Sequence, residues 1–245
     1  WSVNGTNRVG GLIGNIDSGL VDRATSSADV GPGSEQSPGF GIGGIVGTAT
    51  NSAFSNLDAS GDVTGDANVG GALGTATEST VANLTASGDV EIFSTGGGGA
   101  IGFGSGNFTN IHATGDVDGG QQIGGLIGTY QGNGTLQTAT ASGKVNGSNT
   151  VGGLVGRASA NITAATASGE VTGNQYVGGL AGQSNDTLND VHATGNVFGG
   201  GNVGGLIGEN HGDVSNSDAT GNVESEGDNV GGLIGFSEEG NVSTT

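Results

Sequence analysis

Three aspartates recur at one position of a repeating pattern. Asp62, Asp89 and Asp116 stand 27 residues apart, each between a glycine and a valine. If they occupy equivalent positions in consecutive coils of a β-structure, their carboxylates lie about 5 Å apart on one face. Carboxylates that close repel each other unless a cation or high salt intervenes. The spacing therefore favours a cation stack, with Ca²⁺ as the candidate ion, against the alternative of solvated acidic side chains.

The three histidines do not predict a catalytic or metal-binding set. His112 and His192 share a column but stand three coils apart, about 14 Å, which is too far to share a metal or a proton. His211 falls in a turn. We expect all three at the surface, and without a convergent set of titratable groups we expect no enzymatic activity.

Asn-x-Ser/Thr sequons are frequent, and several fall in expected turns, where a glycan could be accommodated. The sequon at Asn83 is set apart, because this asparagine belongs to a column that we expect to point inward. The candidate glycosylation sites are Asn4, Asn107, Asn133, Asn146, Asn161, Asn185 and Asn241.

These candidate residues lie within a repeating sequence pattern. The pattern apolar-Gly-Gly-apolar-apolar-Gly recurs nine times, at spacings of 33, 27, 28, 26, 28, 26, 26 and 27 residues. Gly pairs in every copy oppose a helix, and alternation with a period of two favours strands. The sequence predicts an all-β fold: one parallel β-helix (β-solenoid) over residues 1–245, with about nine coils of 26–28 residues. An insertion loop at residues 31–39, which holds both prolines, lengthens the first interval.

A second motif between these copies ends in Ala-Ser/Thr-Gly-polar-Val. Its final valines form an unbroken column that we expect to line the interior, and its alanines mark where two sheets approach closely. Its asparagines predict an amide ladder at a corner. The valines are Val3, Val30, Val63, Val90, Val117, Val145, Val171, Val197 and Val223; the alanines are Ala59, Ala86, Ala113, Ala141, Ala167, Ala193 and Ala219; the asparagines are Asn56, Asn83, Asn110 and Asn216.

Within the first motif, simple alternation turns the Val and Ile positions inward and the Leu position outward. The Leu column would then be a continuous apolar stripe suited to association, unless curvature of the chain buries it. The stripe consists of Leu12, Leu126, Leu154, Leu180, Leu206 and Leu233, with Ile45, Ala72 and Ala100 between them.

The Gly-Leu-x-Gly core resembles the GLUG motif. GLIG from Gly11, GLVG from Gly153 and GLAG from Gly179 are similar to it, whereas GALG from Gly71 and GAIG from Gly99 replace Leu with Ala. The motif occurs in tandem in secreted and surface-exposed microbial proteins, including adhesins and some large surface peptidases. The resemblance implies a passive repeat region of an extracellular protein, and it carries over no catalytic residue.

The composition of the chain excludes several classes of binding partner. The net charge is −19, with 23 acidic and 4 basic residues, and there is no cysteine. Such a surface disfavours nucleic acid, no apolar run is long enough to span a bilayer, and the excess of acid fits a protein working in high salt. Neither end shows the polar cap that usually closes a solenoid, so we expect copies to stack head to tail, unless the chain is part of a longer repeat protein. The apolar Leu column would allow copies to associate laterally as well.

The sequence therefore favours a secreted, non-catalytic structural or adhesive protein of the cell surface, with a subunit of a surface filament as the more specific hypothesis. Host-surface or matrix glycans are the expected external partners. Two alternatives stay open: a glycan-binding receptor module, which paired aromatic residues would favour, and a tailspike-like glycan-cleaving β-helix. The second would need two carboxylates about 5–9 Å apart across a cleft.

Overall fold

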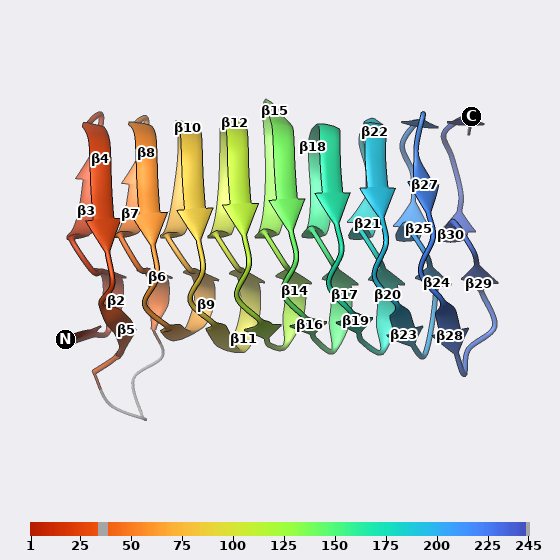
Figure 1. Ribbon diagram of the computed structural model, residues 1–245, viewed down its shortest axis with the longest axis horizontal. Helices are drawn as coiled ribbons and strands as arrows, with labels where there is room; N and C mark the ends of the chain where they lie inside the picture. The colour runs from red at the N-terminus through yellow and green to blue at the C-terminus, as the bar shows by residue number, and fades with distance from the viewer. Residues whose placement is uncertain (34–38, 244–245) are drawn as a thin grey trace.

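The computed structural model describes residues 1–33 and 39–243. These residues form a stack of coils in which every described strand pairing is parallel, and no helix occurs among them. About nine turns run from the N-terminus to the C-terminus along one axis (Figure 1). The predicted parallel β-solenoid is confirmed. Since the described residues contain no helix, none of them provides a long apolar helix that could cross a membrane.

One sheet has 16 strands and lies along the lower side of Figure 1. Its strands are β1 (Ser2–Gly5), β2 (Asn7–Gly10), β5 (Asp29–Pro32), β6 (Phe40–Gly43), β9 (Val63–Gly70), β11 (Val90–Gly98), β13 (Val117–Asp118), β14 (Gln121–Gly124), β16 (Val145–Asn146), β17 (Asn149–Gly152), β19 (Val171–Thr172), β20 (Gln175–Gly178), β23 (Val197–Gly199), β24 (Val203–Gly204), β28 (Val223–Ser225) and β29 (Val230–Gly231).

The other sheet has 15 strands and includes the longest ones. Its strands are β3 (Ile13–Asp17), β4 (Leu20–Ser26), β7 (Val46–Thr50), β8 (Ala53–Ala59), β10 (Leu73–Ala86), β12 (Ile101–Ala113), β15 (Ile127–Ala141), β18 (Val155–Ala167), β21 (Ala181–Ser184), β22 (Leu188–Ala193), β25 (Ile207–Asn210), β26 (Val214–Ser215), β27 (Asp218–Ala219), β30 (Ile234–Ser237) and β31 (Val242–Ser243).

The register follows the repeat. Val3 pairs with Val30, Val30 with Val63, and the pairing continues coil by coil to Val223. From Val30 to Val197 this valine column is buried. The expectation of an unbroken interior column is confirmed.

The interior contains two apolar clusters separated by a narrow waist. The valine column and the first apolar residue of each Gly-Gly motif form one cluster, and the Leu and Ile positions of that motif pack with the second motif in the other. At the waist the alanines face glycines: a Cβ placed on Gly99 would lie 3.0 Å from the Ala113 Cβ, and one on Gly125 would lie 3.1 Å from that of Ala141. The predicted close approach at the alanine column is confirmed, and it requires glycine opposite.

The predicted outward Leu stripe is wrong. Leu126, Leu154, Leu180 and Leu206 are fully buried, Leu233 is partly buried, and only Leu12, in the first coil, is exposed. The reason is a bend. In the sixth copy, for example, β17 ends at Gly152 and β18 begins at Val155, so the alternation restarts after two residues and turns Leu154 inward with Val155. The predicted loop at residues 31–39 falls largely on residues 34–38, which lie outside the described residues.

Candidate functional site

The aspartates predicted to stack do stack, as part of a hydrogen-bonded column that we call the acidic ladder: Asp29, Asp62, Asp89 and Asp116. Each carboxylate accepts a hydrogen bond from the backbone N–H of the equivalent residue one coil later. The donor–acceptor distances are 3.3 Å to Asp62 N, 3.0 Å to Asp89 N, 2.9 Å to Asp116 N and 2.7 Å to Lys144 N. The ladder therefore ties consecutive coils together at a corner.

The geometry of the ladder gives no support to the expected cation site. Within residues 1–33 and 39–243, no group of three or more His, Cys, Asp or Glu side chains is arranged to hold a metal ion. One oxygen of each aspartate is already bonded to a backbone N–H, and carboxylates stacked along an axis do not converge on one point. The geometry thus gives no support to the cation stack proposed for Asp62, Asp89 and Asp116, which stays a prediction beside the alternative of solvated acidic side chains.

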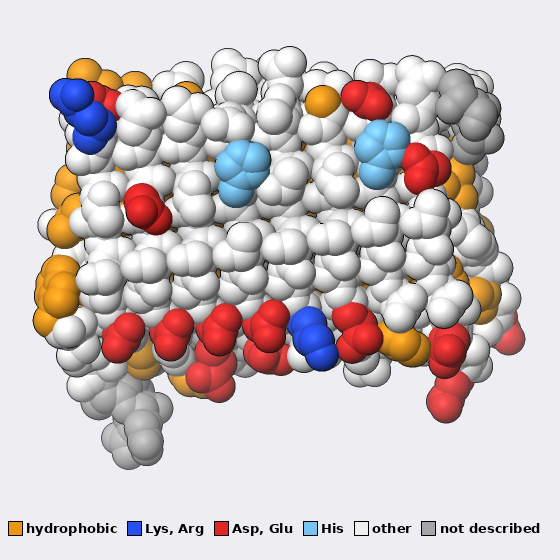
Figure 2. All heavy atoms as spheres, in the orientation of Figure 1, with side chains coloured by type: hydrophobic (Ala, Val, Ile, Leu, Met, Phe, Trp, Pro, Cys, Tyr) orange, Lys and Arg blue, Asp and Glu red, His pale blue; other side chains and the backbone are white. Residues whose placement is uncertain are grey.

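The ladder nevertheless borders a strongly acidic surface. Asp62, Asp89, Asp116, Glu91 and Asp118 line a shallow hollow of about 570 Å³ on the 16-stranded sheet. Figure 2 shows acidic side chains in a row along this lower edge, interrupted by a basic one. The carboxylates lie side by side on an open face, whereas glycan cleavage needs two of them on opposite sides of a sugar.

The two histidines of one column have different partners. His112 contacts the Thr140 hydroxyl at 2.7 Å and the Asn110 amide oxygen at 2.8 Å, both neutral groups. His192 contacts two carboxylates, those of Asp218 in the next coil and of Asp190, the latter at 3.3 Å. The hydrogen bond to Asp218 is the main cause that raises the pKa of His192. Sequence reasoning placed both residues correctly at the surface in one column but missed these contacts.

The third histidine also bridges two coils. His211 Nε2 lies 2.9 Å from Glu209 in its own coil, and Nδ1 lies 3.5 Å from Glu238 in the next one. Both histidines with carboxylate partners therefore lie in the C-terminal coils.

The asparagine ladder forms, but it faces outward. Asn83 donates to the Asn56 amide oxygen at 3.1 Å, and Asn110 donates to that of Asn83 at 2.8 Å. Asn216 donates instead to Asn189. Asn56, Asn83, Asn110 and Asn216 all have a φ between 51° and 57°, a left-handed conformation that asparagine tolerates better than most residues. The inward placement of Asn83 is wrong, because its side chain is exposed.

The seven candidate glycosylation asparagines are all exposed. Several of their side chains already bond to the neighbouring coil: Asn146 donates to Asp118, Asn185 to Ser159 and Asn241 to Asp213. Asn4, Asn133 and Asn161 are exposed as well. Exposure makes these sequons accessible, and their modification stays a prediction.

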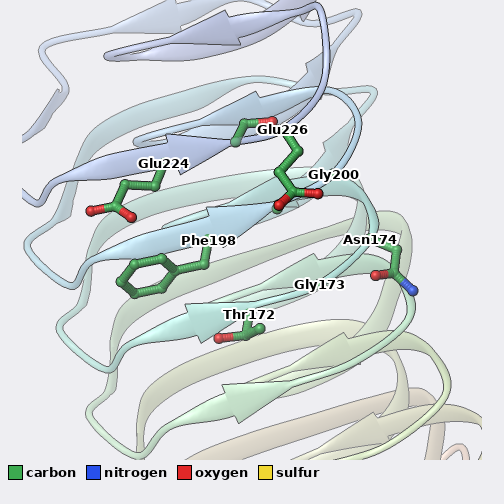
Figure 3. Close-up of a pocket in the computed structure, with 9 residues that line it drawn as sticks. Thr172, Gly173, Asn174, Phe198, Gly200, Glu224 and Glu226 are labelled. Atoms are coloured by element: carbon green, nitrogen blue, oxygen red, sulfur yellow. The ribbon is translucent and has the colours of Figure 1, made fainter.

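Sequence reasoning missed two hollows that each contain a phenylalanine ring, exposed for Phe93 and half-buried for Phe198. The first, which we call the Phe198 hollow, has about 400 Å³ and is lined by Phe198 with Thr172, Asn174, Glu224, Glu226 and neighbouring glycines (Figure 3). The second, the Phe93 hollow, has about 490 Å³ and is lined by Phe93 with Glu91, Asp118, Asn146 and Ser148. A sequence signal existed for the first: Phe198 is the only aromatic residue in a column otherwise made of Thr64, Glu91, Asp118, Asn146, Thr172 and Glu224.

Comparison with known proteins supports the repeat. The GLUG motif matches residues 147–172 and 199–224. Each match covers one coil, from the turn before a Gly-Gly motif to the strand that closes the second motif. GLUG motif repeats are therefore present in this chain, as the resemblance implied. No curated protein and no solved structure matches the chain.

Proposed function

We propose that this chain is a non-catalytic structural or adhesive β-solenoid that works outside the cell. The observation that carries the proposal is the continuous register of the coils, in which the valine column pairs coil by coil from Val3 to Val223. At about 4.8 Å per coil, nine coils give a rod about 40 Å long. Stacked coils of this kind form an extended scaffold with long exposed faces.

The exterior fits that role. The rows outside the core carry carboxylates, amides and hydroxyls, and all seven candidate sequons are exposed on them. A charge of −19 favours solubility and is best tolerated where salt screens the repulsion. These features support an extracellular location and a high-salt setting.

The two ends of the rod support stacking on further coils. Trp1 and Leu20 are 70% and 75% exposed in the first coil, and Val230 and Val242 are 47% and 45% exposed at the other end. A coil of the same cross-section, from the same polypeptide or from a second copy, would cover these apolar groups. We therefore include head-to-tail association in the proposal.

Electron microscopy of native material tests the structural role. Filaments whose width matches one solenoid support a structural role with head-to-tail association, and discrete particles one solenoid long contradict that association and leave the adhesive role. A parallel assay incubates the purified chain with a panel of polysaccharides and measures new reducing ends. We expect none, and their release would overturn the non-catalytic assignment.

A further inference from the structure

The Phe198 and Phe93 hollows have the same chemical make-up. Each combines an exposed or half-exposed phenylalanine ring with two exposed carboxylates, Glu224 and Glu226 in one and Glu91 and Asp118 in the other. Both lie on the 16-stranded sheet beside the row of acidic residues. Figure 3 shows Glu224 and Glu226 in the coil next to the one that carries Phe198, with Glu226 just beyond the end of β28.

The carboxylates of the hollows have no cationic partner. In the part of the chain that the structure describes, no Lys, Arg or His lies within ion-pair distance of Glu91, Asp118, Glu224 or Glu226. The one lysine on this edge, Lys144, lies 3.9 Å from Glu170. The Asp118 carboxylate accepts only a neutral amide hydrogen bond, from Asn146 at 2.8 Å. The hollows therefore offer net negative charge next to an aromatic face.

That pairing selects for a particular ligand chemistry. The face of an aromatic ring attracts an ammonium or guanidinium group, and a nearby carboxylate strengthens the attraction. A lysine or arginine side chain also has an apolar stem that can lie along the ring. A neutral sugar could also stack on a phenylalanine and donate hydroxyl hydrogen bonds to the carboxylates, but it would leave their negative charge unbalanced.

We propose that this edge of the solenoid binds a basic, extended polypeptide segment, with one Lys or Arg side chain in the Phe198 hollow and another in the Phe93 hollow. Phe93 and Phe198 follow valines that are four coils apart in the register, so the hollows are separated by about 19 Å along the axis. An extended chain rises about 3.3 Å per residue, so two basic residues about six positions apart would reach both hollows. With only four Lys and Arg residues in this chain, the basic partner is a different protein.

This proposal deepens the adhesive part of the proposed function by naming the partner's chemistry, and it does not depend on end-to-end stacking. The probe is a fluorescently labelled Gly/Ser peptide with two lysines about six positions apart, measured by fluorescence anisotropy at low and moderate salt. Peptides with one lysine, or with both replaced by glutamine, are the ligand controls. We expect the two-lysine peptide to bind at least about tenfold more tightly than the one-lysine peptide, because the second contact is intramolecular.

Variants of the protein separate a specific site from general charge attraction. Phe198→Ala and Phe93→Ala should each weaken binding about two- to fivefold, the range of an exposed cation–π contact. Phe40→Ala is the matched control, because Phe40 is also about half exposed but lines neither hollow. Glu224→Gln with Glu226→Gln should weaken binding as well. Circular dichroism should show the same β-structure for all variants.

Three outcomes would overturn the proposal. Equal binding of all three Phe variants would mean that the peptide only senses the negative charge. Equal affinity for peptides with one and two lysines would exclude the paired hollows. Phe-dependent binding of a neutral oligosaccharide, with none of the basic peptide, would assign the hollows to glycans. None of these outcomes affects the rod-like structural role, which the microscopy tests separately.

Discussion

The middle coils and the C-terminal coils follow one repeat but are held together differently. In the middle, β12, β15 and β18 have 13 to 15 residues, and Phe108 and Tyr130 pack with ring centroids 5.4 Å apart in the core. Towards the C-terminus, β26, β27 and β31 have two residues each, and most side chains after Val223 are at least partly exposed. There, His192 and His211 bridge carboxylates of adjacent coils. The C-terminal half therefore adds histidine–carboxylate contacts between coils, and only its last coils bury less apolar surface.

The largest expected difference concerns equivalent leucines. Leu126→Ala removes a fully buried side chain and should lower the free energy of unfolding by about 2–5 kcal/mol. Leu233→Ala, at the same position of the last coil, should cost less than about half as much, because Leu233 is already partly exposed. Urea unfolding of both variants measures the two losses of unfolding free energy. Equal costs would show that the last coil is as tightly packed as the middle.

The second difference concerns pH. Because the folded-state pKa of His192 is raised, its contribution to stability is present below the unfolded-state value of about 6.5 and is lost as the pH rises through the folded-state pKa. Amides of β22 and β27 should therefore exchange with solvent more readily, after correction for the intrinsic pH dependence of exchange, as the pH is raised from about 5 to 8.

Matched variants isolate the cause of this pH dependence. His192→Gln should remove it, and the matched control is His112→Gln, at the same position of the repeat but beside the neutral Thr140 and Asn110 side chains. A pH dependence that persists in His192→Gln would contradict its assignment to this histidine.

The smallest expected effect concerns the acidic ladder. Asp89→Asn keeps the acceptor for the Asp116 N–H and removes repulsion with its neighbours, so it should be neutral or slightly stabilising at low salt. Asn196, whose amide oxygen accepts from the Asn222 N–H, occupies the same column. Asn196→Asp should have the opposite sign, because it places a carboxylate beside Glu170. Thermal unfolding at low and molar salt measures both, and a marked destabilisation of Asp89→Asn would contradict this account.

Spacing in the sequence was enough to predict the coils and their register. The valine, alanine and asparagine columns all lie where the repeat places them, because residues at one position of a solenoid must stack. Alternation failed at the Leu column, because the two-residue bend after Gly152 resets the direction in which side chains point. The period-two alternation of side chains along a strand does not indicate where that strand ends.

The contacts of the site were less predictable. Asp218 follows His192 in the same column, so their contact was visible in the repeat once the coils were aligned. The Phe93 hollow had no such signal, since Phe93 lies where the pairing of β11 with β9 shifts register. Local irregularities of this kind arise from the packing of one coil on the next and are not encoded in the repeat.

The direction of the backbone hydrogen bonds has a mechanical consequence. They join one coil to the next, as from Val90 N to Asp116 O and from Val117 N to Lys144 O, and so they run along the rod. Tension applied along the rod loads these layers in series, so the weakest layer carries the same force as the strongest. The rod should lengthen by losing single coils, beginning near the two-residue strands β26, β27 and β31, while the long middle strands remain paired.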